Sequence, residues 1–169
     1  MSTLFVNNLN TASGTTITVP TGKTLVGTDT GTLRMPGSAI QIVRTANATV
    51  LQGTFATQTN VLSLSITPKA SNSIIHIQGA MQLHNDATGS YWMLRLMRDS
   101  TQVIGSMFSA FGYQLAAGER DMLPINHTEV SGSTSARTYH IACHRNSGTG
   151  TMQVNYGNYG NMTIIEYAQ

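Results

Sequence analysis

The chain has 169 residues, of which only 9% are charged, and its formal net charge is +2. Globular domains usually carry roughly 25% charged residues, so much of this surface is uncharged, and the nine basic residues form no stripe of the kind that nucleic-acid binding needs. The single cysteine, Cys143, excludes an intrachain disulfide and a cysteine zinc site, and no cofactor is expected.

Residues 1–36 form the first predicted unit, an N-terminal attachment and stem segment. Thr and Gly interrupt very short β-branched runs between residues 15 and 31, and Met35, Pro36 and Gly37 close the segment. Such strands have little to bury, so they need partners from other chains, as in the intertwined stem of a fibrous trimer. We therefore predict a homotrimer. No export signal and no run of about 20 apolar residues is present, so neither secretion nor membrane insertion is expected.

Residues 37–169 form the second predicted unit, a β-sandwich head domain. Two-residue alternations separated by turn clusters are typical of a sandwich or barrel, and no window has a helical period with caps. The fold class is all-β, with antiparallel strands in a jelly-roll-like sandwich. The predicted strands are 39–45, 49–56, 61–67, 73–82, 91–98, 102–109, 121–128, 137–145, 151–156 and 162–167.

Some strands are apolar on both faces, notably residues 73–77 and 91–97. A solitary sandwich buries only one face of each sheet, so the second face needs a partner or a covering loop. Met adapts to irregular contacts, and aromatic residues are enriched at interfaces. We divide Trp92, Met93, Met97 and Met107 between the core and a subunit interface.

The run 156–161 contains the best candidates for receptor contact, namely Tyr156, Asn158, Tyr159 and Asn161. Tyrosine rings offer flat faces for sugars, and asparagine supplies hydrogen bonds. An ordinary hairpin turn is the competing interpretation. If the C-terminal strand ends near the stem, strand counting places this run at the far tip, together with the turns at 68–72, 99–101 and 129–136.

Other constellations give weaker predictions. On one strand face His140 and His144 lie about 13 Å apart, too far for one metal ion. One histidine per chain on a threefold axis would supply three ligands, and His76, His84, His127, His140 and His144 are the candidates. Glu119 and Asp121 are the carboxylates that a glycosidase would need, but a solvated loop end explains them equally well. Cys143 alternates with Tyr139 and Ile141, which predicts a small buried hydrophobe.

Several segments together resemble the short tail-fibre proteins of marine bacteriophages. The matching segments are 1–8 (MSTLFVNN), 17–25 (ITVPTGKTL), 36–43 (PGSAIQIV), 62–68 (LSLSITP) followed by Ser71 and Asn72, and the terminal 162–167 (MTIIEY). The resemblance covers most of the chain, but each element is a simple strand-and-turn pattern. Many such fibres have a longer shaft, whereas this stem spans only residues 4–36.

The resemblance implies a non-enzymatic virion protein that is assembled in the host cytoplasm and released by lysis. It implies a trimeric tail fibre or short spike, attached to other virion proteins through residues 1–36, whose head contacts a glycan or protein of the host surface. A decoration or head-fibre protein that stabilises the capsid is the first alternative. A carbohydrate-active enzyme is the second.

Overall fold

The computed structural model describes residues 20–24, 26, 35–45, 49–87, 89–103 and 117–169. Within these residues the chain forms ten strands and one short 3-10 turn, η1 (Tyr156–Asn158). The strands are β1 (Ala39–Thr45), β2 (Leu51–Gly53), β3 (Thr59–Ile66), β4 (Ile74–Asn85), β5 (Tyr91–Arg98), β6 (Thr101–Gln102), β7 (Arg120–Val130), β8 (Arg137–Ser147), β9 (Met152–Val154) and β10 (Asn161–Tyr167). Every predicted strand overlaps an observed one, and residues 104–109 of the sixth lie outside the described residues.

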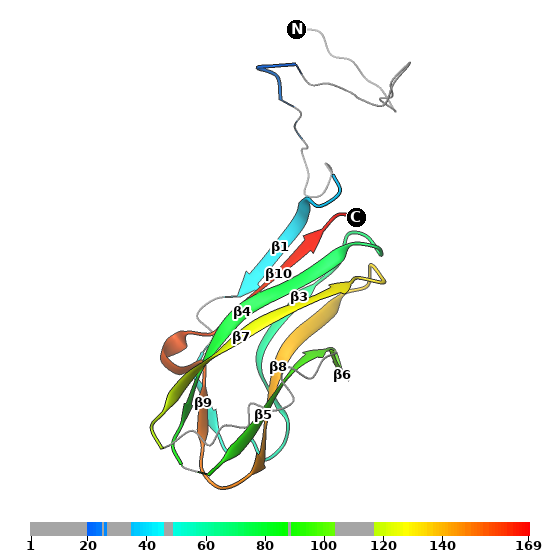
Figure 1. Cartoon of the computed structure of the whole chain (residues 1–169). Helices are drawn as coiled ribbons and strands as arrows, with labels where there is room; N and C mark the ends of the chain where they lie inside the picture. The colour runs from blue at the N-terminus through cyan, green and yellow to red at the C-terminus, as the bar shows by residue number, and fades with distance from the viewer. Residues whose placement is uncertain (1–19, 25, 27–34, 46–48, 88, 104–116) are drawn as a thin grey trace.

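The strands form two antiparallel sheets that face each other (Figure 1). In the first sheet, β7 lies along one side of β4, and β10 and β9 share the other side, because β4 is long enough for both. β10 then pairs with β1, and β9 pairs with β2. The second sheet has the order β3-β8-β5-β6. The predicted all-β, antiparallel fold class is confirmed.

The strand order is that of a jelly roll. When β1 and β2 are counted as one interrupted strand, and β9 and β10 as another, the two sheets have the orders 1-8-3-6 and 2-7-4-5. Successive strands therefore cross repeatedly between the sheets, as in two interlocked Greek keys. The first strand of this pattern is observed as β1 and β2, and residues 155–160 divide the last strand into β9 and β10.

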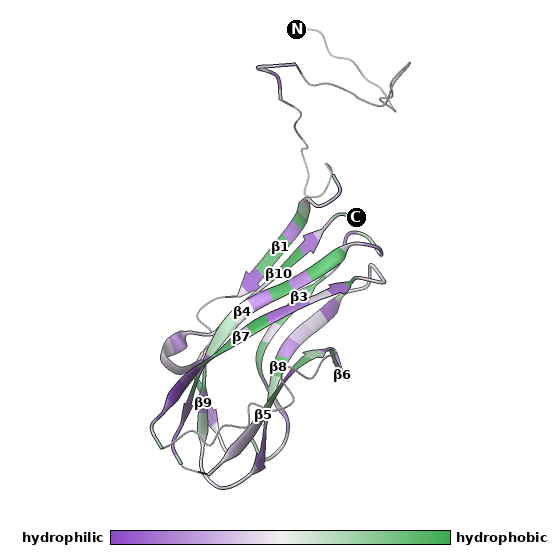
Figure 2. Cartoon of the chain, viewed as in Figure 1, coloured by the Kyte–Doolittle hydropathy of each residue, from purple (hydrophilic) through white to green (hydrophobic). Residues whose placement is uncertain are grey.

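The core lies between the sheets and follows the alternation of the strands. Residues of β4 and β10 alternate between buried and more exposed, and Figure 2 shows the matching alternation of hydrophobic and hydrophilic residues along these ribbons. Cys143 is fully buried among Tyr139, Ile141 and Met152, so the predicted small hydrophobe is confirmed. Burial raises the pKa of its thiol to about 12. The largest fully buried apolar side chains are Trp92, Tyr139, Ile75, Ile77, Met81, Leu94, Leu123, Ile141, Met152, Met162 and Ile164.

A buried carboxylate holds the end of the sandwich where β1 begins and β10 ends, which we call the C-terminal end. Glu166 accepts hydrogen bonds from the backbone N–H groups of Lys69 and Ala70, from the Ser73 hydroxyl and from the Gln41 amide. Burial alone would raise the pKa of Glu166, but these hydrogen bonds outweigh it and lower the pKa. The loop between β3 and β4 is thereby fastened to β10.

The chain enters the sandwich at this same end. Gly37 N–H donates to the Ala168 carbonyl over 2.8 Å, and Ala168 N–H donates to Ser38 over 2.9 Å. Most of the predicted 1–36 stem lies outside the described residues, so the stem and the trimer stay predictions. Within the described part of the chain, no helix is long and apolar enough to cross a membrane.

Candidate functional site

The turn that carries the tyrosines lies on the side of the sandwich, not at its tip. Both β9 and β10 run antiparallel to β4, with Met152 opposite Asn85 and Tyr167 opposite Ile74. The chain therefore leaves the sheet at 155–160 and returns in the same direction, as Figure 1 shows beside β4. The predicted tip location is wrong, and so is the hairpin interpretation, because strand counting assumed that every turn reverses the chain.

The three turns that were grouped with this tip lie instead at the C-terminal end. Ile74, which follows the 68–72 turn, pairs with Val130 and with Tyr167. The 99–101 turn joins β5 to β6, and Asp99 N–H donates to the Thr138 carbonyl beside the 129–136 turn. Asp86, Ser90 and the loop 147–151 lie at the opposite, distal end. Thr151 N–H donates to Asp86 there over 2.6 Å, and Ser90 donates to the Thr149 carbonyl.

Buried Asn155 sets the conformation of the side turn. Its backbone has φ 59°, and its side-chain amide donates to the carbonyls of Thr49 and Val61, both over 3.1 Å. Asn158 N–H then donates to the Asn155 carbonyl over 2.8 Å. Gly157 has φ 65°, and a Cβ there would lie 2.9 Å from the Tyr159 ring, so only glycine allows this ring position. The turn is fixed to both sheets.

Tyr156 is held in place by its neighbours and is only partly exposed. Its ring stacks on His84 with centroids 4.9 Å apart, and the Arg120 guanidinium carbon lies 4.4 Å from its centroid. Arg120 also donates to the Tyr156 hydroxyl over 2.8 Å. Tyr156 is therefore packed against its neighbours, and its part in receptor contact stays a prediction. Tyr159, in contrast, is 64% exposed.

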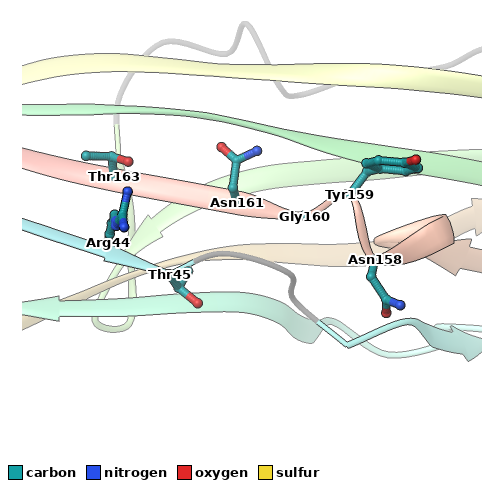
Figure 3. A pocket seen from close by; sticks show the side chains of 7 residues that line it. All are labelled: Arg44, Thr45, Asn158, Tyr159, Gly160, Asn161 and Thr163. Atoms are coloured by element: carbon teal, nitrogen blue, oxygen red, sulfur yellow. The ribbon is translucent and has the colours of Figure 1, made fainter.

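A pocket of about 300 Å³ lies beside this turn, where β1 ends and β10 begins. It is lined by Arg44, Thr45, Asn158, Tyr159, Gly160, Asn161 and Thr163. Figure 3 shows Arg44 and Thr163 at one end of this row, Tyr159 at the other and Asn161 between them. Arg44 and Thr163 are direct partners in the β1–β10 register, and Asn161 lies two residues before Thr163 on the same strand face. We call this the lateral pocket.

The lateral pocket joins three of the four predicted contact residues, Asn158, Tyr159 and Asn161. Sequence reasoning missed Arg44, Thr45 and Thr163, because their place in the pocket follows from the pairing of β1 with β10, two segments more than 100 positions apart in the chain. No local pattern encodes that pairing. Their role in receptor contact stays a prediction.

The lateral pocket has an uncompensated positive charge. Arg44 is exposed, and among the described residues it pairs with no carboxylate. A second pocket, of about 410 Å³, lies at the C-terminal end and is lined in part by Arg98 and Arg137. There Glu129 accepts from Arg98 over 2.8 Å and lies 3.8 Å from Arg137, and Asp99 also lines the pocket, so two carboxylates face the two cations. Of these two pockets, as formed by the described residues, the lateral pocket is the one whose arginine has no carboxylate partner.

Glu129 also organises the charged groups behind the second pocket. The Tyr139 hydroxyl donates to Glu129. Burial raises the pKa of Tyr139 well above its ordinary value, and the Glu129 carboxylate raises it further. The hydrogen bond to Glu129 raises the pKa of Arg98 as well. These shifts keep the tyrosine neutral and the arginine charged at physiological pH, as expected for a structural cluster.

The five histidines are dispersed. His76 and His84 lie on the outer face of β4, His127 lies on β7, and His140 and His144 lie on β8. No group of three metal-ligating side chains occurs among the described residues. A metal on a threefold axis stays a prediction. Glu119 and Asp121 line neither pocket, and Asp121 accepts from the adjacent Met122 N–H.

The predicted interface residues differ in exposure. Trp92 is 1% exposed within the core, and Met97 is 6% exposed, so a single chain already buries most of both side chains. Met93 is half-buried, and Met107 lies outside the described residues. A subunit contact through this face stays a prediction.

Comparisons with known proteins place the fold among viral proteins. No protein-family model matches the chain, and no curated protein matches its sequence. A solved structure of infectious bursal disease virus, Gx strain, matches 76% of the chain with TM-score 0.51 and 14% identity. The VP2 subviral particle of infectious bursal disease virus matches 85% with TM-score 0.51 and 13% identity.

The chain covers 32% and 37% of those two chains, so it spans about a third of their length. At these identities the likeness establishes a shared fold and nothing more. The resemblance to marine phage tail fibres stays a prediction.

Proposed function

We propose that the chain is a structural protein of a bacteriophage particle, a tail fibre or short spike that contacts the host surface without catalysis. The observation that carries the proposal is the jelly roll in which the start of β1 and the end of β10 lie together. The segment that precedes β1 and the last residues after β10 meet at the C-terminal end through Gly37, Ser38 and Ala168. Anchoring through residues 1–36 leaves the side and the distal end of the head free for contact.

In this proposal the protein acts by avidity. A homotrimer presents three identical heads, and several spikes on one particle multiply them further. Each engaged head holds the next at high effective concentration, so weak single contacts give strong attachment without a new type of contact. The low content of charged residues, 9%, suits a chain whose surface is partly covered in an assembly.

A second candidate is a decoration or head-fibre protein that stabilises the capsid. The fold shared with the VP2 subviral particle of infectious bursal disease virus favours it, because jelly rolls are common in capsids. In this case residues 1–36 bind the shell and the head projects from it. The two candidates make different predictions about where the protein lies on the particle.

Immunogold labelling of purified particles of the encoding virus separates the two candidates. Gold at the tail supports the fibre or spike, and gold over the head supports the decoration protein. Absence of the chain from purified particles, checked by mass spectrometry, contradicts both. Light scattering of the purified chain tests the trimer: a mass near three times 18.1 kDa supports it, whereas a mass of 18.1 kDa contradicts it.

A further inference from the structure

We propose that the lateral pocket binds an acidic saccharide, with Arg44 on its carboxylate or sulfate group and Tyr159 against a sugar ring. The inference rests on the proposed host-surface role and specifies the class of receptor. It follows from three features of the pocket: its polar lining, its uncompensated cation and the fixed position of its aromatic residue.

The lining favours a ligand that is rich in hydrogen-bonding groups. Pockets for small organic molecules are lined predominantly by apolar side chains, whereas here the only large apolar surface is the Tyr159 ring. Asn161 and Thr163 provide an amide and a hydroxyl group that both donate and accept, whereas Figure 3 shows the side chains of Thr45 and Asn158 pointing away from these two. A polyhydroxylated ligand satisfies such groups, and an apolar one leaves them without partners at a cost.

The position of Arg44 selects a negative charge. Its guanidinium lies opposite Thr163 on the outer face of the sheet, and no described carboxylate neutralises it. Guanidinium groups bind carboxylate and sulfate-like oxyanions through two parallel hydrogen bonds. A neutral sugar would leave this charge unused, so the pocket distinguishes acidic from neutral saccharides.

The aromatic side of the pocket is preorganised. Asn155 fixes the turn to Thr49 and Val61, and Tyr156 is clamped by His84 and Arg120. The exposed Tyr159 ring rests against Gly157, whose hydrogen leaves room for it. Little conformational entropy is therefore lost on this side of the pocket when a ligand binds, because these side chains are already fixed. A small contact area then gives a higher affinity.

Nucleic acid is a poor fit for the same site. The lateral pocket contains one guanidinium, and binding to a phosphate backbone requires several clustered cations. The other pocket contains two arginines, but both are paired with Glu129, and a second carboxylate, Asp99, also lines it. The single free charge and the single exposed ring suit one acidic sugar residue and its neighbour.

The test is isothermal titration calorimetry of the full-length chain with four oligosaccharides and one salt. The probes are tetragalacturonate, sialyllactose, a sulfated carrageenan tetrasaccharide, neutral maltotetraose and sodium sulfate. We expect at least one acidic saccharide to bind more tightly than maltotetraose, and R44Q to weaken it about tenfold or more, the loss of a charge-assisted hydrogen bond. Y159A is expected to weaken it similarly, whereas Y159F keeps the ring and most of the affinity.

Lys69→Gln is the matched charge control. It removes one exposed positive charge, and the Lys69 backbone is bonded to Glu166, which lies about 10 Å along β10 from Thr163, the register partner of Arg44, at 3.3 Å per residue. This variant is expected to bind like the wild type. Arg44 and Tyr159 are exposed, so their replacement leaves the core untouched, and circular dichroism confirms folding of each variant.

Three outcomes overturn the inference: no acidic probe binds, binding is unchanged in R44Q and Y159A, or sodium sulfate binds as tightly as the saccharides, which would indicate an anion site only. None of them bears on where gold labels the particle. A tail-labelled protein that binds no acidic saccharide contradicts this inference alone, whereas a chain absent from the particle contradicts the proposed function.

Discussion

Replacing Glu166 by glutamine tests how the C-terminal end of the sandwich is held together. One carboxylate oxygen of Glu166 accepts from Lys69 N–H over 2.8 Å, from Ala70 N–H over 3.2 Å and from the Ser73 hydroxyl, and the other accepts from Gln41 and, over 3.0 Å, from Lys69 N–H. Glutamine retains one acceptor oxygen for the two backbone donors. Its amino group, however, is a donor that faces the amide donor of Gln41.

The expected loss follows from counting these bonds. Hydrogen bonds to charged groups contribute about 1.5–3 kcal/mol each, against about 0.5–1.5 kcal/mol for neutral ones. In E166Q three contacts become neutral and that with Gln41 becomes repulsive unless its amide turns over. Because Lys69 is exposed and Ala70 partly exposed, water compensates in part, and we expect about 1.5–3 kcal/mol of destabilisation.

The stabilisation by Glu166 should depend on pH in a predictable direction. The pKa of Glu166 is lowered in the folded protein, so its carboxylate stabilises the fold above the unfolded pKa, which is about 4.3 for glutamate. That contribution disappears as the pH falls through the folded pKa. The difference in unfolding free energy between wild type and E166Q should therefore be constant near neutrality and shrink below about pH 4.3.

Guanidinium denaturation of both proteins at equal concentration, between pH 3 and pH 8, measures this difference. Equal concentration matters because the stability of an oligomer depends on it. Lys69→Gln controls for changes in the same loop and should have little effect. This role of Glu166 is refuted if the difference in unfolding free energy between wild type and E166Q is the same at every pH or is absent at pH 7. Either result would mean that the ionised Glu166 does not hold the loop between β3 and β4.

Three further substitutions have expected outcomes. Gly79→Ala should destabilise the protein by about 3 kcal/mol in guanidinium denaturation, because its Cβ would lie 2.2 Å from a backbone oxygen of β10; Gly53→Ala, where the nearest atom is 3.6 Å away, is the control. Cys143 should resist a thiol-reactive reagent until the protein unfolds, since it is fully buried, and rapid labelling of the native protein would contradict its place in the core. Tyr139→Phe should cost about 1–2 kcal/mol through the lost hydrogen bond to Glu129, and unchanged stability would show that this bond contributes nothing.

The strands were predictable because their signals are local. Leu62, Leu64 and Ile66 alternate with serines, and β3 contains all three. The predicted bounds 39–45 and 91–98 are those of β1 and β5. Period-two alternation reports which residues share a face, and turn residues report where a strand stops, so both follow from short stretches of sequence.

The location of the side turn was not predictable from the same signals. Gly157 and the asparagines around it indicate that the strand is broken there. A hairpin turn and an interruption after which the strand continues in the same direction use the same residue types, however, so these residues do not distinguish the two. The difference is made by β4, whose twelve residues pair with both β9 and β10. The place of Arg44 in the lateral pocket depends on the pairing of β1 with β10, which lie still further apart in the sequence.

The side turn interrupts the sheet through residues with positive φ. Asn155, Gly157 and Asn158 all have positive φ, and an uninterrupted strand from β9 to β10 would instead have paired with Met81 and Gln82 of β4. Asparagine tolerates this conformation better than most residues, yet it still costs free energy. Backbone of this kind persists where neighbouring groups hold it in place. Here the side-chain amide of Asn155 donates hydrogen bonds to the carbonyls of Thr49 and Val61. The interruption gives this side of the sandwich a polar concavity, the lateral pocket, which is why our proposal puts ligand binding there and not at the distal loops.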